Sequence, residues 1–174
     1  HSGTLGPAEI PLKRVYIFKD CIRTARHLGV PFSAPPSHPF NPLLALRVAT
    51  ADPTREVIDA LYRAIWGGGN GVETEAAVAS ALGDRGAELI GAAREPVTKQ
   101  KLRAATDAAI ATGVFGVPTV VVDGELFWGV DSFAHLDRFL AGIDPITPDD
   151  AAAFGRLVPS ANRVSAMTAR TLSL

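Results

Sequence analysis

The residue types that usually carry catalysis are few in this chain and widely spaced. Cys21 is the single cysteine, and it falls on the same predicted helical face as Phe18 and Ile22, with no second cysteine or base spaced to activate it. Such a thiol is typical of a structural cysteine packed among apolar side chains. The histidines show no spacing typical of metal ligands (His27, His38, His135). We therefore predict no metal site, and these residue types identify no catalytic group.

One stretch, "GVPTVVVDGELFWG" at 116–129, has features that suggest ligand recognition through the backbone. Pro118 stands directly before the apolar run 119–122, and a proline is accepted at the first residue of a strand because it cannot donate to the sheet. Pro118 either marks where the strand begins or forms a cis bond with Val117 that turns backbone groups toward a ligand. Asp123-Gly124 is a strong signal for a type I′ turn, so the stretch predicts a β-hairpin.

The overall composition narrows the class of protein. The chain has 174 residues, 47% hydrophobic and 20% charged, which is typical of a globular domain with a sizeable core. Its net charge is −1 and no basic patch is visible, so nucleic acid and anionic membranes are poor candidate partners. No apolar run is long enough to span a bilayer. One cysteine without a partner favours an intracellular, cytoplasmic location.

The elements that must position these residues are mostly helices. Helical periodicity covers 12–28, which Gly29 would terminate, and a connector with five prolines follows at 30–42. Asp52 is expected to cap a helix that begins at Pro53 and ends near Trp66. Further helices are predicted at 42–51, 73–82, 85–93, 97–112, 132–140 (capped by Asp131) and near 149–157. The consecutive valines 120–122 predict a strand covered on both faces, yet no third strand is visible.

Four segments, in order, resemble one known family. "GVFGVPTVVVDGELFWGVDSFAHLDRFL" is similar to the C-terminal half of a thioredoxin-fold domain. More narrowly, it resembles the 2-hydroxychromene-2-carboxylate isomerase and kappa-class glutathione transferase family, which belongs to the DsbA-like group. "SGTLGPAEIPLKRVYIFKDCIRTARHLGVPF" resembles the family's loop and first inserted helix, and "HPFNPLLALRVA" and "LYRAIWGGGNGVETEAAVASAL" resemble its helical insertion. The resemblance covers about residues 2–142.

The resemblance implies an α/β, thioredoxin-like (DsbA-like) domain with a large all-helical insertion. Residues 1–11 and 97–142 would form the thioredoxin-like portion, 12–96 the helical insertion and 143–174 a C-terminal extension. The family's N-terminal βαβ unit, which supplies two strands and a catalytic serine, has no counterpart in these 174 residues. We therefore expect the N-terminal strands to be absent from this sequence, and the catalytic residue is unknown.

The resemblance also implies a glutathione site around the hairpin. Val117 matches the residue whose backbone pairs with the cysteinyl part of glutathione, like an added strand. Pro118 matches the family's cis-proline, which would present the Val117 peptide groups to the ligand. Asp131 matches the acidic residue that binds the γ-glutamyl ammonium, although a plain helix cap is the alternative.

Three other positions of the implied glutathione site are more weakly indicated. Thr4 and Val130 stand where the family commonly has Asn and Ser, and each replacement removes a side-chain hydrogen bond worth about 0.5–1.5 kcal/mol. Their backbone N–H groups are unaffected, so the resemblance implies weakened binding. Lys13 matches a basic residue near the glutathione carboxylates, and a solvated lysine on the first helical turn is equally compatible.

The implied activity is that of a glutathione-dependent isomerase or transferase acting on a small aromatic electrophile, in a homodimer. The glutathione thiolate would add to the substrate, allow rotation about a carbon–carbon bond, and leave. One alternative is a non-catalytic thioredoxin-like protein that binds a partner or dimerises through an open sheet edge. A DsbA-type thiol-disulfide oxidoreductase is a further alternative if a CxxC motif lies upstream.

Overall fold

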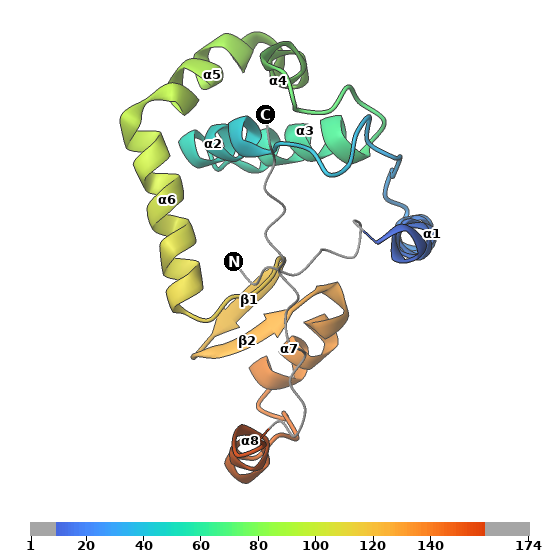
Figure 1. The fold of residues 1–174 in the computed structure, drawn as a ribbon, viewed down its shortest axis with the longest axis vertical. Helices are drawn as coiled ribbons and strands as arrows, with labels where there is room; N and C mark the ends of the chain where they lie inside the picture. Colours follow the sequence, from blue (N-terminus) through green and yellow to red (C-terminus); the bar gives the residue numbers. More distant parts are fainter. Residues whose placement is uncertain (1–9, 159–174) are drawn as a thin grey trace, which may run out of the picture. The chain divides into compact units, whose positions relative to one another are not determined.

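The structure, a computed structural model, describes residues 10–158, and the chain divides after Gly113 into two units (Figure 1). The first unit contains α1 (Pro11–Leu28), α2 (Leu43–Ala51), α3 (Arg55–Trp66), α4 (Glu75–Leu82), the 3₁₀ turn η2 (Gly83–Arg85), α5 (Gly86–Arg94) and α6 (Pro96–Ala111). The second contains β1 (Thr119–Val122), β2 (Glu125–Trp128), the 3₁₀ turn η3 (Val130–Ser132), α7 (Phe133–Leu140) and α8 (Pro148–Gly155). Residues 1–9 of the predicted thioredoxin-like portion and residues 159–174 of the predicted C-terminal extension lie outside the described residues.

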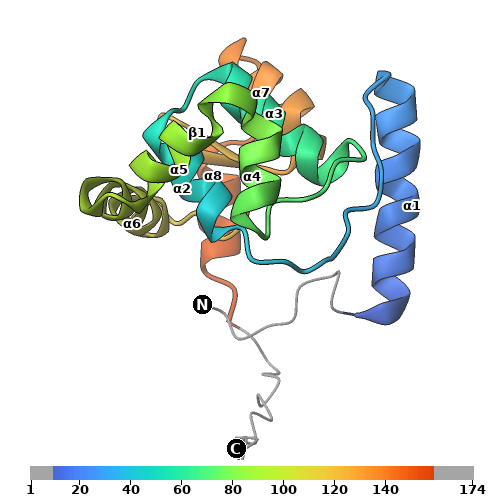
Figure 2. The same ribbon diagram turned by 90° about the horizontal axis from the view of Figure 1, so that it is seen from above.

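An apolar core formed by α2, α3, α4 and α5 holds the first unit together. In α3, Val57, Leu61 and Ala64 recur at helical spacing, so they share the face that is buried. The buried apolar residues of this core are Ala45, Val48, Val57, Leu61, Ala64, Val72, Val78, Leu89, Ile90 and Ala93. Figures 1 and 2 show these helices packed side by side. The helices predicted over these segments are confirmed, with ends that differ by one or two residues.

Asp52 has a different role from the predicted one. The helix α3 begins at Arg55 with Thr54 at the N-cap position, so the prediction that Asp52 caps it is wrong. Instead, Asp52 Oδ1 accepts a hydrogen bond from the Thr54 N–H at 3.1 Å, two residues ahead. Its other oxygen lies 2.7 Å from the Arg85 guanidinium in η2. The Thr54 hydrogen bonds, and then Arg85, lower the pKa of Asp52 below its usual value.

The helix α1 stands apart from the core helices, as Figure 2 shows. It has no buried residue, and Leu12, Val15 and Tyr16 are more than half exposed. It ends as predicted at Gly29, which has φ 66° and donates its N–H to carbonyls of the last turn. The proline-rich segment that follows returns to the core, and its His38 ring packs edge-on against Phe18 of α1. Aromatic contacts with this segment therefore help to hold α1.

The second unit is built on the predicted hairpin, which is confirmed. Strands β1 and β2 are antiparallel, and Asp123 (φ 50°) and Gly124 (φ 85°) occupy the turn with the positive φ values that a type I′ turn requires. Phe127 is buried against Phe139 of α7, with ring centroids 5.4 Å apart. The prediction of a strand covered on both faces is wrong for the described residues, because Val121 is 40% exposed.

The helix expected near 149–157 is confirmed as α8, where the Thr147 and Asp150 side chains form a capping box. In the part of the chain that the structure describes, no helix is long and apolar enough to cross a bilayer.

The division after Gly113 rests on packing, whereas the domain boundaries predicted from the sequence (1–11 with 97–142, 12–96 and 143–174) rest on family resemblance. Those boundaries therefore stay a prediction.

We predict that Leu61→Ala lowers the free energy of unfolding by about 2–5 kcal/mol, because it leaves a cavity in the core of the first unit. Leu61 is 5% exposed, whereas Leu46 on α2 is 47% exposed. Leu46→Ala is therefore the matched control, with an expected loss below about 1 kcal/mol. Urea unfolding followed by far-UV circular dichroism measures both. Equal losses in the two variants would contradict the assigned core.

The lowered pKa of Asp52 predicts that part of the free energy of unfolding depends on pH in the acid range. Because its folded-state pKa is depressed, its contribution is present above the unfolded pKa of about 3.9 and is lost as the pH falls through the folded value. Asp52→Asn should therefore show a smaller drop in urea midpoint between pH 6 and pH 3 than the parent chain. Asp84→Asn is the control, since Asp84 forms no ion pair within residues 10–158. An unchanged drop in Asp52→Asn would refute the role of this carboxylate.

Candidate functional site

The hairpin register brings together two of the predicted site segments. Thr119 pairs with Trp128 at the open end of the hairpin, and the Gly129 N–H donates to the Pro118 carbonyl at 2.9 Å. This hydrogen bond extends the pairing by one residue beyond the strands. Val117 and Val130 are the residues that follow this last pair on the two chain ends that leave the hairpin. The hairpin thus makes the two predicted segments start from one hydrogen-bonded pair, Pro118 and Gly129.

Val117 presents a free peptide edge at this place. The Val117–Pro118 peptide bond is cis, and the Val117 residue is 86% exposed. Within residues 10–158, neither its N–H nor its C=O forms a hydrogen bond. A backbone donor and acceptor left open on an exposed residue can pair with an extended peptide in the manner of an added strand.

Asp131 lies in η3 and does not cap α7, so the prediction of a helix cap is wrong. Ser132 occupies the N-cap position without capping the helix, because its hydroxyl donates to the Gly129 carbonyl at 2.8 Å. The Asp131 side chain is exposed and forms no hydrogen bond or ion pair among the described residues. Its carboxylate is therefore available to a cationic group of a ligand. Val130, beside it, is 59% exposed.

Two glycines and an aromatic pair fix the shape of this site. Gly129 has φ 84° and ψ 157°, a conformation that is essentially confined to glycine, and a Cβ there would collide with Asp131 Oδ1. A Cβ on Gly116 would meet the Trp128 indole nitrogen at 2.5 Å. Trp128 packs on Phe115 with ring centroids 5.3 Å apart, and both rings are more than half exposed. The site therefore combines polar groups with an adjacent apolar surface.

The two other predicted site residues, Lys13 and Thr4, do not belong to the second unit. Lys13 lies in the first turn of α1, in the first unit, with an exposed side chain, and its contact with glutathione stays a prediction. Thr4 lies outside the described residues. Among the described residues, no three His, Cys, Asp or Glu side chains are close enough to hold a metal ion.

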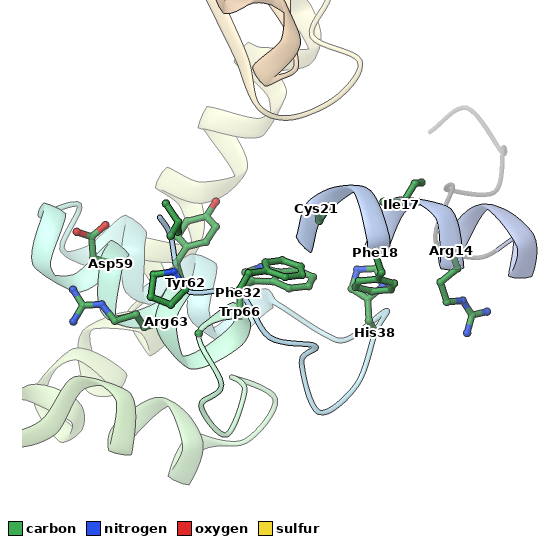
Figure 3. Close-up of a pocket in the computed structure, with 13 residues that line it drawn as sticks. Arg14, Ile17, Phe18, Cys21, Phe32, His38, Asp59, Tyr62, Arg63 and Trp66 are labelled. Carbon is green, nitrogen blue, oxygen red and sulfur yellow. The ribbon is translucent and has the colours of Figure 1, made fainter. Parts of the chain in front are cut away.

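A cavity of about 550 Å³ lies within the first unit, between α1, the proline-rich segment and α3 (Figure 3). The Phe32 and Trp66 rings are stacked in its wall, 5.6 Å apart and 8° from parallel. This cavity was not predicted from the sequence, because the proline-rich segment has no periodicity that would show where its rings point. The aromatic residues alternating with prolines at 31–40 were the available signal.

Cys21 lines this cavity and is half-buried, less deeply placed than predicted. Burial, and then the neighbouring Asp20 carboxylate, raise the pKa of its thiol above the ordinary value. A thiol with a raised pKa remains protonated near neutral pH and is a poor nucleophile. The structure therefore agrees with a cysteine that is not activated for attack.

The helical unit and the hairpin with its closing helix α7 define a thioredoxin-like protein with a helical insertion. The family model of the DSBA-like thioredoxin domain matches residues 1–141. The chain belongs to this family, in the group that contains 2-hydroxychromene-2-carboxylate isomerases and kappa-class glutathione transferases. The resemblance inferred from the sequence motifs is thereby confirmed.

Individual relatives agree with this placement. The chain is 29% identical to a 2-hydroxychromene-2-carboxylate isomerase of Sphingobium xenophagum, over 80% of this chain and 75% of the relative. It is 28% identical to glutathione S-transferase kappa 2 of Caenorhabditis elegans, over 78% and 69%. A Pseudomonas 2-hydroxychromene-2-carboxylate isomerase is 32% identical, over 80% and 69%. The solved structure of a 2-hydroxychromene-2-carboxylate isomerase superposes with a TM-score of 0.65 at 21% identity, covering 81% and 72% of the two chains, which supports the fold alone.

We predict that Gly129→Ala weakens the hairpin more than Gly124→Ala does. Both glycines have positive φ, so alanine strains the backbone at either position by about 1–3 kcal/mol. A Cβ meets nothing within 4 Å at Gly124, and at Gly129 it meets the end of the exposed Asp131 side chain, which can move aside. The difference therefore comes from the backbone, because φ 84° with ψ 157° at Gly129 is essentially confined to glycine, whereas Gly124 occupies a type I′ turn. Hydrogen exchange of the β1 and β2 amides measures the local opening free energy.

The double variant Gly129→Ala/Asp131→Ala should recover little of this loss, because it removes the Asp131 carboxylate but leaves the backbone strain at residue 129. The backbone conformation given to Gly129 would be wrong if Gly129→Ala cost no more than Gly124→Ala, or if the double variant restored the hairpin to its original stability.

Proposed function

We propose that this protein is a glutathione-dependent isomerase or transferase that acts on a small aromatic electrophile. Its kinship with enzymes named 2-hydroxychromene-2-carboxylate isomerase and glutathione S-transferase kappa supports this reaction class. The observation that carries the glutathione dependence is the presence, in one unit, of a peptide edge at Val117 and a carboxylate at Asp131 that have no partner within residues 10–158. Glutathione is an extended tripeptide with a free amino group, so it fits both features.

In this proposal, residues at the open end of the hairpin hold glutathione. The Val117 N–H and C=O pair with the cysteinyl peptide of glutathione, and the Asp131 carboxylate binds the γ-glutamyl ammonium. The Val130 N–H contributes a backbone donor, and Pro118 keeps the Val117 edge free of the hairpin ladder. Lys13 and Thr4 are proposed to contact the rest of the tripeptide, as the family resemblance implies.

When bound, glutathione would supply the thiol that adds to the electrophile and leaves again. This chain's own contribution is to orient the tripeptide between Val117 and Asp131 and to keep it next to an apolar surface. The exposed rings of Phe115 and Trp128 provide such a surface in the same unit. No residue of the chain is assigned to thiol activation. A homodimer and a cytoplasmic location, both expected from the sequence analysis, are part of the same proposal.

We predict that Asp131→Asn raises the dissociation constant for glutathione about tenfold or more. The reason is that a hydrogen bond to a charged group contributes about 1.5–3 kcal/mol. Asp137→Asn is the matched control, since Asp137 is an exposed carboxylate of α7 with no ion pair among the described residues. Isothermal titration of glutathione into each variant gives the constants.

The reaction itself is tested by the conversion of 2-hydroxychromene-2-carboxylate, followed by absorbance with and without glutathione. Turnover that requires glutathione, and that falls in Asp131→Asn but not in Asp137→Asn, would support the proposal. The proposal fails if glutathione does not bind, if both variants bind it equally, or if turnover does not depend on it.

A further inference from the structure

A second cavity of the first unit is lined by α3, α4 and the glycine-rich loop 67–71 that follows α3. Its volume is about 470 Å³, within the range of about 300–1,000 Å³ that is usual for ligand pockets. Alanines of the two helices form the apolar part of its wall, and the loop with Arg63 forms the polar part. None of the residues proposed to hold glutathione lines it.

Arg63 gives this cavity a positive charge. It lies in the last turn of α3, its side chain is exposed, and its guanidinium has no ion pair or hydrogen bond within residues 10–158. In Figure 3 the guanidinium extends away from the Phe32 and Trp66 rings of the first cavity. Among the described residues, no aspartate or glutamate lines the second cavity. The charge of the lining therefore favours an anion.

Three consecutive backbone N–H groups of the loop are available beside this charge. In the part of the chain that the structure describes, the N–H groups of Gly68, Gly69 and Asn70 donate no hydrogen bond. Gly67 has φ −98° and ψ 13°, and Gly68 has φ 88°. A right-handed residue followed by a left-handed one is the backbone path of an anion-binding nest, in which successive N–H groups turn toward one side.

The carbonyl groups that end α3 would repel an anion if they were left open. Two of them are occupied by the loop itself. The Arg63 carbonyl accepts the N–H of Gly67 at 2.9 Å. The Ala64 carbonyl accepts the N–H of Gly71, also at 2.9 Å. The loop thus covers acceptors of the helix end and keeps its middle N–H groups free as donors.

Close packing fixes the loop next to the Arg63 side of α3. A Cβ on Gly67 would stand 2.8 Å from the Arg63 carbonyl oxygen, and a Cβ on Gly69 would stand 2.7 Å from Ala64 Cα. Both of these atoms belong to the backbone, so no side-chain movement could relieve the collision. Glycine is therefore required at both positions, and the loop is held where its free donors share a cavity with the guanidinium.

Two further polar side chains line the cavity. Ser80 of α4 contributes a hydroxyl and Asn70 of the loop contributes an amide, and neither has a partner among the described residues. A guanidinium, successive N–H groups and a hydroxyl together offer many donors and little competing negative charge. A tetrahedral phosphate group, with several charged oxygens, matches such a set better than a carboxylate with two oxygens does.

We propose that this cavity is a binding site for a phosphate group, either free or as a small phosphate ester. Arg63 pairs with phosphate oxygens, the N–H groups of 68–70 bind the others, and the alanine wall contacts the organic part of an ester. The loop GGGNG is followed by Val-Glu and lacks the Lys-Ser/Thr ending of nucleotide phosphate loops, so no nucleoside triphosphate is implied.

This assignment goes beyond the glutathione-dependent reaction proposed above, because it requires neither glutathione nor turnover. The test is isothermal titration, without glutathione, of inorganic phosphate, glycerol 3-phosphate, acetate and glycerol. We expect one inorganic phosphate per chain, displaced by glycerol 3-phosphate, with acetate and glycerol at least about tenfold weaker. Tighter binding of glycerol 3-phosphate than of inorganic phosphate would identify an ester as the occupant, and equal binding would identify free phosphate; both support the site.

Variants locate the contacts. Arg63→Gln should weaken phosphate at least about tenfold, and Arg63→Lys should weaken it less, because lysine keeps the charge but not the two-pronged geometry. Ser80→Asp, on an exposed position, should abolish binding by placing a negative charge in the lining. Arg23→Gln is the matched control, since it removes an exposed arginine of α1 outside the lining and should change nothing. Far-UV circular dichroism checks that each variant is folded.

Amide NMR shifts test the loop donors directly. Inorganic phosphate should shift the amide resonances of 68–70 most, and Arg63→Gln should remove these shifts. The proposal is overturned if phosphate shows no saturable binding up to about 10 mM, or if acetate binds as tightly as phosphate. It is also overturned if Arg63→Gln and Ser80→Asp leave the phosphate constant unchanged, or if the shifts are confined to other parts of the chain.

Discussion

The hydrogen bond from the Gly129 N–H to the Pro118 carbonyl is the interaction on which the candidate site depends. It closes the hairpin one residue beyond the last strand pair, at Pro118, whose nitrogen carries no hydrogen to donate to the sheet. Gly129 takes a backbone conformation that other residues avoid, and this turns the chain into η3 with Asp131 on its exposed side. Without this closure, nothing local would keep the Val117 edge and the Asp131 carboxylate together.

The two units differ in how many of their apolar residues are buried and in how many polar groups are left unpaired. The first unit buries its apolar residues in a helical core, and its α1 helix buries none. Among residues 114–158, the second unit has one well-buried ring, Phe127, and the backbone groups of Val117 and the carboxylate of Asp131 at the hairpin end have no partner. Unpaired polar groups and exposed rings contribute little to stability, so their presence on an otherwise ordered frame suits binding better than folding.

Much of the fold could be predicted from the sequence, because helical spacing and the Asp123-Gly124 turn act locally. The candidate site was harder to predict from the sequence. Asp52 and Asp131 both looked like helix caps, but the Asp52 carboxylate bonds Thr54 and Arg85, and the Asp131 carboxylate, in a 3₁₀ turn, has no partner among the described residues. Capping residues and loop residues have the same composition, so only the backbone path separates them. The cavity wall was not predictable, since the proline-rich segment gives its rings no period.

The central claim is that the open end of the hairpin is a glutathione site. An NMR titration of the isotope-labelled protein with glutathione tests it most directly. Our account predicts saturable amide shifts concentrated at 115–119 and 128–132, with the largest change at Val117. Shifts that are confined to other parts of the chain, or the absence of any saturable shift, would contradict it.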